Sequence, residues 1–191
     1  MSCGLGDGEY LIAACIDKRP AFMHLEQLQG WQSMVDGEIA AIGHACGNGW
    51  RKVFNVYAKL LWALAKEPLI VEALRPALAP VAVFERWQDY RDACLLQAGS
   101  ATALMFSVPP PKTAAAAPLH IIMGRGYGQA LAQRNDAGFI LEWLNESFAI
   151  DRENRVIVCP YFDYRQLSDA RIETLVSVVR GLYQPRLEPL L

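Results

Sequence analysis

The chain alternates between short apolar runs and longer stretches in which apolar positions recur with a helical spacing. Nearly continuous apolar runs bounded by Gly, Pro or charged residues are typical of strands buried inside a sheet. Such runs occur at four places, which we predict to be strands: Glu9–Ile16, Thr102–Val108, Leu119–Met123 and Arg155–Cys159.

Apolar positions three or four residues apart predict helices over much of the remaining sequence. The clearest stripe runs from Trp50 to Leu64, with Asn48 as its expected N-cap, and it ends before Pro68. Pro80 is expected in the first turn of another helix, which Gly99 closes. Further stripes predict helices at Tyr127–Arg134, at Phe139–Leu144, and from Ser168 or Asp169 to about Leu182.

Two segments are less regular. The alanine-rich residues 112–118 predict a flexible crossover between the second and third strands. Residues 148–158 are consistent either with a helix-to-strand connection or with a hairpin around Asp151–Asn154, and the hairpin would add an antiparallel edge strand.

Buried strands that alternate with helices predict a parallel sheet covered on both faces. We therefore predict one α/β domain over residues 1–191, a three-layer sandwich with a four-stranded, mainly parallel sheet. A long helical segment, from about residue 21 to 99, separates the first strand from the second.

The composition is that of a soluble globular protein, with 53% apolar and 20% charged residues in a chain of 191. The longest uncharged stretch, Ala93–Pro111, is interrupted by Gly, Ser and Pro, so it does not predict a membrane span. The N-terminus lacks the basic and apolar regions of a secretory signal. We expect a cytoplasmic, bacterial-type protein without a membrane partner; the sequence does not predict its oligomeric state.

Metal and disulfide chemistry are not expected. The five cysteines are scattered and never spaced as C-x-x-C, and there are only three histidines. We predict no metal and no cofactor. The net charge of −2 argues against attraction of nucleic acid to the whole surface.

The stretch L-H-I-I-M-G-R-G-Y-G-Q-A-L carries three glycines at the end of the third predicted strand. Their G-x-G-x-G spacing does not match the dinucleotide fingerprint, and the chain has no G-K-[ST] sequence for a Walker loop. Gly124, Arg125, Gly126 and Gly128 are nevertheless candidate ligand-binding residues, because a helix N-terminus with uncovered N–H groups attracts anions. The alternative is that the glycines only permit a tight turn.

Ligands of parallel sheets bind beyond the carboxyl ends of the strands. The fourth predicted strand is followed by P-Y-F-D-Y-R-Q-L-S, in which Tyr161 and Tyr164 can stack on a base and Arg165 can meet a phosphate. Asp163, together with Asp17 after the first strand, is a candidate catalytic carboxylate. Alternatively, the aromatic residues cap the core and Asp163 pairs with Arg165 on the surface.

This order of elements resembles the uracil-DNA glycosylase-like fold, a four-stranded parallel sheet between helices. In that family, a catalytic loop follows the first strand, a glycine turn the third, and His-Pro-Ser the fourth. The resemblance implies that Asp17 stands for the water-activating acid. Cys159-Pro160-Tyr161 replaces His-Pro-Ser, and no asparagine follows the second strand. A thiolate would repel a departing uracil anion, so base excision is not expected.

Three functions follow as hypotheses, and only one of them requires catalysis. The first is binding of a nucleotide or nucleic acid at the carboxyl ends of the strands. The second is a protein-interaction module that uses the tryptophans of the helical half, Trp31, Trp50, Trp62 and Trp87. The third is a cysteine-dependent hydrolase using Cys46, just ahead of a helix, where the thiol pKa is expected to fall.

Overall fold

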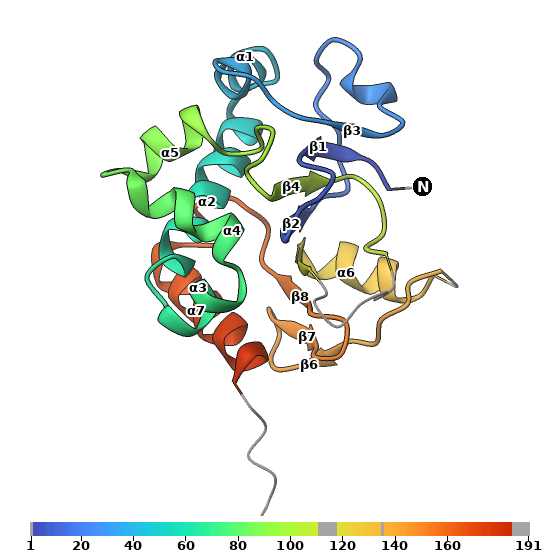
Figure 1. The fold of residues 1–191 in the computed structure, drawn as a ribbon. Helices are drawn as coiled ribbons and strands as arrows, with labels where there is room; N and C mark the ends of the chain where they lie inside the picture. The colour runs from blue at the N-terminus through green and yellow to red at the C-terminus, as the bar shows by residue number, and fades with distance from the viewer. Residues whose placement is uncertain (1, 111–117, 135, 185–191) are drawn as a thin grey trace, which may run out of the picture.

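One mixed sheet of eight strands forms the centre of the computed structural model, which describes residues 2–110, 118–134 and 136–184 (Figure 1). Its strand order is β3-β1-β4-β2-β5-β8-β7-β6. The strands are β1 Gly4–Gly6, β2 Ile12–Cys15, β3 Trp31–Gln32, β4 Thr102–Met105, β5 Leu119–Met123, β6 Glu142–Trp143, β7 Ala149–Asp151 and β8 Val156–Cys159.

The four predicted strands are β2, β4, β5 and β8, and they form the parallel centre of the sheet. The predicted extent of the sheet is wrong, because β1 and β3 extend it on one side and β7 and β6 on the other. β1 runs antiparallel to β4, β7 to β8, and β6 to β7. These added strands have two or three residues each, which is too few to show a periodic pattern.

Helices account for most of the segment between β2 and β4, although β3 and two short 3₁₀ helices also lie there. The helices are α1 Glu38–Ala45, α2 Asn48–Leu64, α3 Pro68–Ala73, α4 Arg75–Leu78, α5 Trp87–Ala93, α6 Arg125–Ala132 and α7 Asp169–Tyr183; the 3₁₀ helices are η1 Leu25–Gln27 and η2 Ala79–Val83.

Several predicted boundaries change. Asn48 is not the N-cap of α2 but lies within it, and the N-cap is Gly47, whose φ of 84° favours glycine. The helix predicted from Pro80 to Gly99 is divided into η2 and α5, because Phe84 is extended between them. α7 begins at Asp169 after Ser168, as predicted.

The region after α6 contains the clearest error. The helix predicted at Phe139–Leu144 is wrong, because Glu142 and Trp143 pair with β7 as the strand β6. Of the two alternatives for residues 148–158, the hairpin is correct: β7 and β8 pair directly in antiparallel register. The predicted crossover at residues 112–118 lies, except for its last residue, outside the described residues.

Helices cover both faces of the sheet (Figure 1). α2 and α7 contribute to the larger apolar core on one face, and α6 contributes to a smaller core on the other. The Tyr57 hydroxyl on α2 lies 3.1 Å from the Ile12 carbonyl oxygen and 3.0 Å from that of Ala103, which fixes α2 across β2 and β4. Among the described residues, no helix is both long and apolar enough to cross a membrane.

The chain leaves the neighbouring strands β2 and β5 toward opposite faces. The connection from β2 to β4 crosses the face of the sheet that α2 covers. The connection from β5 to β8 crosses the opposite face, which α6 covers. Such a reversal leaves a crevice outside the carboxyl ends of the two strands, which is where ligands of open α/β sheets bind.

Gly128 brings α6 close to the sheet. A Cβ atom at this position would lie 2.6 and 2.8 Å from the two Cγ atoms of Val158 on β8. Gly126, two residues earlier on the same helix, has open space where its Cβ would be. Gly128 is thus required for packing, and Gly126 is not.

We expect Gly128→Ala to lower the free energy of unfolding by about 1–3 kcal/mol, because Val158 is buried and stiff at χ1. Gly126→Ala is the matched control, and its added methyl should leave stability unchanged or slightly higher. Urea denaturation of both variants measures the difference. Equal stability of the two variants would contradict the close approach of Gly128 to Val158.

His120 is a buried titratable group on β5. Its side chain is 2% exposed, its Nε2 lies 3.0 Å from the Tyr10 hydroxyl, and its Nδ1 has no recorded partner in the described parts of the chain. Burial lowers the pKa of His120 from 6.5 to about 4, because the charged imidazolium is poorly solvated there.

This shift predicts acid sensitivity. Below about pH 6.5 the unfolded chain binds a proton that the folded chain takes up only near pH 4, so stability is lost as the pH falls through this window. His120→Gln should remove roughly 2–4 kcal/mol of this pH dependence. Tyr10→Phe retains the buried imidazole and should retain the dependence. Urea unfolding at pH 7 and pH 4 separates the two variants; parallel pH profiles for wild type and His120→Gln would refute the assignment.

Candidate functional site

Asp17 lies just beyond the carboxyl end of β2 and is exposed to solvent. The pKa values of the Tyr127 and Tyr161 hydroxyls are raised, first by burial of the two side chains and further by anionic neighbours that include Asp17. Tyr127 belongs to the first turn of α6, and Tyr161 follows β8. Asp17 therefore lies close enough to residues of both neighbouring loops for its charge to act on them.

The glycine loop follows β5, the neighbour of β2, at the same carboxyl edge of the sheet. The Gly124 N–H donates to the Cys159 carbonyl oxygen over 2.7 Å, and its φ of 93° favours glycine. No side chain caps α6, so its first N–H groups lack an intrahelical partner. Added Cβ atoms at Gly124 and Gly126 would meet open space. The backbone at the start of α6 is thus accessible.

Arg125 does not contribute its charge to this loop. Its Nη1 donates to the Glu146 carbonyl oxygen over 3.0 Å, and its guanidinium lies 4.8 Å from the ring centroid of Trp143 on β6. The side chain therefore extends toward the β6–β7 hairpin. Of the predicted residues of the loop, Gly124 and Gly126 present open backbone, Gly128 packs on β8, and Arg125 is directed elsewhere.

A cavity of about 540 Å³ lies at the carboxyl end of β4, lined by residues that include Cys3, Arg19, Ser107 and Arg134. Arg19 is fixed by donation to the carbonyl oxygens of Glu26 and Leu28, at 3.1 and 2.8 Å. Arg134 Nε donates to Asp136 Oδ1 over 2.9 Å, so its charge is paired within the lining of the same cavity.

Asp163, a predicted catalytic carboxylate, is bound to α2. Its Oδ2 lies 2.6 Å from Lys52 Nζ, and its Oδ1 accepts the Arg165 N–H over 2.9 Å. The lysine, followed by this N–H group, holds the pKa of Asp163 below its usual range. The direct ion-pair partner of Asp163 is thus Lys52, and the charge of Arg165 makes a smaller contribution to the lowered pKa. An ion-paired carboxylate with a lowered pKa is suited to positioning rather than to accepting a proton.

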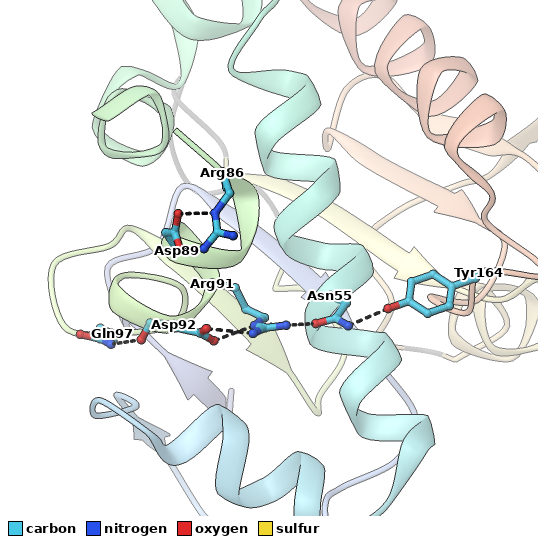
Figure 2. Close-up of polar contacts among 7 residues, drawn as sticks. All are labelled: Asn55, Arg86, Asp89, Arg91, Asp92, Gln97 and Tyr164. Atoms are coloured by element: carbon cyan, nitrogen blue, oxygen red, sulfur yellow. Dashed lines mark hydrogen bonds and ion pairs between the residues drawn. The ribbon is translucent and has the colours of Figure 1, made fainter. Parts of the chain in front are cut away.

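Tyr164 is also directed toward α2. Asn55 Nδ2 donates to the Tyr164 hydroxyl over 2.6 Å, and Asn55 Oδ1 accepts from Arg91 (Figure 2). Asp92 in turn accepts from Arg91 Nε over 2.7 Å, and Lys59 Nζ lies 5.6 Å from the Tyr164 ring centroid. The phenol therefore lies on a polar chain across α2 and α5, not free in the crevice.

The structure thus brings together only part of the predicted site. The charge of Asp17 acts on Tyr161 and Tyr127, and the accessible glycine backbone follows β5 at the same edge of the sheet. Arg165 is exposed, and its charge contributes to the lowered pKa of Asp163. Tyr127 was missed although it lies within the glycine motif itself. Lys52 could not have been found from the sequence, because only the fold brings residue 52 to residue 163.

The described residues contain no group of three or more His, Cys, Asp or Glu side chains that could hold a metal ion. The expected fall in the pKa of Cys46 is wrong: burial, with a further contribution from Glu26, raises it. Cys46 caps the C-terminus of α1 instead of facing the start of α2. Nothing in this geometry activates the thiol as a nucleophile.

Fold and site together define an α/β protein with a mixed sheet and with polar residues at the carboxyl ends of its parallel strands, where the strand order reverses. The chain belongs to DUF6942, a family of unknown function, whose model matches residues 3–180. No curated protein and no solved structure matches the chain.

Asn55 is 9% exposed and uses both ends of its amide. We expect Asn55→Ala to lower the free energy of unfolding by about 1–3 kcal/mol, because Arg91 and Tyr164 each lose a buried partner. Amide hydrogen exchange should also speed up at residues 162–166. Asn48→Ala, exposed on the same helix, is the control and should change stability by less than about 0.5 kcal/mol. Unchanged exchange at residues 162–166 would show that Asn55 does not hold this loop.

Proposed function

We propose that this protein binds a nucleotide, free or as one unit of a nucleic-acid strand, in the crevice between the carboxyl ends of β2 and β5. The observation that carries the proposal is the meeting of Asp17, the uncapped start of α6, and the Tyr127 and Tyr161 side chains at the reversal of strand order. Such a crevice is the usual ligand site of an open α/β sheet.

Each part of a nucleotide has a chemically suitable neighbour there. The uncovered N–H groups at the start of α6 are suited to a phosphate, and the exposed Arg165, in the loop after β8, can add positive charge. The phenol rings of Tyr127 and Tyr161 offer surfaces for a base. Asp17 can accept hydrogen bonds from a base N–H or a ribose hydroxyl.

Base excision is not part of the proposal. Cys159, at the position that the glycosylase-like resemblance gives to a histidine, is fully buried, and its Sγ donates to the Pro160 carbonyl oxygen over 3.3 Å. Burial raises the pKa of this thiol, so it stays neutral and away from the crevice. The resemblance to the uracil-DNA glycosylase-like fold, and a cytoplasmic location, remain predictions from the sequence.

The interaction-module hypothesis has less support. Trp50, Trp62 and Trp87 are partly buried against the larger core, and Trp31 packs against the smaller one. The tryptophans of the helical half therefore stabilise the interior and do not form an exposed apolar face.

The proposal is tested by thermal-shift and calorimetric titration with ribonucleoside monophosphates, free bases, and short single strands with and without uracil. A ligand that binds only the folded state raises the melting temperature. Asp17→Asn should weaken binding about tenfold or more, because an amide replaces the charged acceptor. Gly126→Ala should weaken binding similarly, because its methyl group would lie over the N–H groups at the helix start.

Gly181→Ala on α7 is the matched control for Gly126→Ala, since its added Cβ also meets open space within a helix. Both alanine variants should fold at least as stably as wild type, but only Gly126→Ala should lose affinity. Absence of binding by every nucleotide probe, or binding that Asp17→Asn and Gly126→Ala leave intact, would refute the proposal.

A further inference from the structure

A second cavity, of about 450 Å³, lies where α1, α2 and α5 meet. None of its lining residues also lines the cavity at the end of β4. The polar residues of its wall are His44 from α1, Asn48, Arg51 and Asn55 from α2, and Arg91 from α5.

The charge of this lining has one sign. Two arginines and a histidine face the cavity together with two amides, and none of its lining residues is an Asp or Glu. Asp92, which pairs with Arg91, does not line the cavity, and its side chain is 52% exposed. A wall with arginines and no carboxylate is suited to a ligand with negative charge.

Both arginines are oriented before any ligand binds. Arg91, with a side chain 21% exposed, donates from Nε and Nη2 to Asp92 and from Nη1 to Asn55 (Figure 2), so two of its five N–H groups remain available. Arg51 Nη2 donates to Asn48 Oδ1 over 2.5 Å. Arg91, held at three of its N–H groups, loses little further conformational freedom on binding.

The rest of the wall is apolar. Phe54 is fully buried and Ile39 is 8% exposed, and both line the cavity beside Ala40. The volume falls within the range of small-molecule sites, which combine apolar walls with a few polar groups of fixed orientation. The occupant therefore needs an apolar body as well as an anionic group.

We propose that the cavity between α1, α2 and α5 binds a small organic anion, a carboxylate or phosphate monoester with a compact apolar body, through Arg51 and Arg91. This site is separate from the proposed nucleotide crevice. The anionic group of the ligand binds to the two guanidinium groups, and the apolar body of the ligand packs against Phe54 and Ile39.

The experiment is a calorimetric and NMR titration of the full chain with phenyl phosphate and benzoate. Inorganic phosphate and uncharged benzamide are the probes for the anionic group alone and the apolar body alone. Phenyl phosphate or benzoate should bind at least about tenfold more tightly than benzamide, because charge-assisted hydrogen bonds require the anion. Amide resonances of residues 39–55 should shift.

Arg51→Gln should weaken the binding of phenyl phosphate or benzoate about tenfold. Arg86→Gln is the matched control, because Arg86 immediately precedes α5 and pairs with Asp89 but does not line the cavity (Figure 2). It removes the same charge from the same region and should leave binding within about twofold. Arg51 is exposed, so its loss should not unfold the chain.

The nucleotide proposal and the anion-site proposal can be refuted independently of each other. Asp17→Asn and Gly126→Ala should leave the affinity for phenyl phosphate unchanged, whereas Arg51→Gln should leave nucleotide binding at the crevice unchanged. No binding of phenyl phosphate or benzoate at millimolar concentration, equal binding of benzamide, or equal effects of Arg51→Gln and Arg86→Gln would each overturn the proposed anion site.

Discussion

The burial of four parallel strands on both faces is the constraint on which the rest of the structure depends. β4, β2, β5 and β8 are buried along their whole lengths, so the chain must place helices on either side of them. The connection after β2 supplies one face and α6 supplies part of the other. Because these connections diverge from adjacent strands, the crevice beside Asp17 is a geometric result of covering the sheet.

The parts of this architecture that were predictable have strong local signals. β5 agrees with its prediction to the residue, and α2 to within two residues at its start, because each forms a continuous apolar run or stripe. β1 lacked such a signal: it has three residues, and Gly4 and Gly6 are needed where a Cβ would approach a carbonyl oxygen of β4 to 2.4 Å. β6 lies inside a predicted helix because Phe139, Ile140, Trp143 and Leu144 have a helical spacing, whereas its own two residues are too few for a strand pattern; only pairing with β7 defines it as a strand.

The candidate site was predictable only as a location. The sequence indicates that residues after β2, β5 and β8 converge, since parallel strands share a carboxyl edge. It does not indicate which side chains α2 binds. Lys52 and Asn55 lie on one face of that helix, and they hold Asp163 and Tyr164, two residues otherwise available to a ligand. Long-range polar pairs of this kind decide which residues of the loop after β8 have a structural role and which are available to a ligand. No local sequence pattern encodes these pairs.

The shortness of β3 and β6 has a consequence for association between copies of the chain. These two strands form the edges of the sheet and have only two residues each, so each exposes few unpaired backbone groups. Long, flat edges are templates on which another chain can extend a sheet, and very short ones are a common protection. Ile140 and Leu144 are exposed on either side of β6, where a longer edge would combine apolar surface with free backbone donors. The abrupt end of the sheet thus protects this chain against edge-to-edge aggregation.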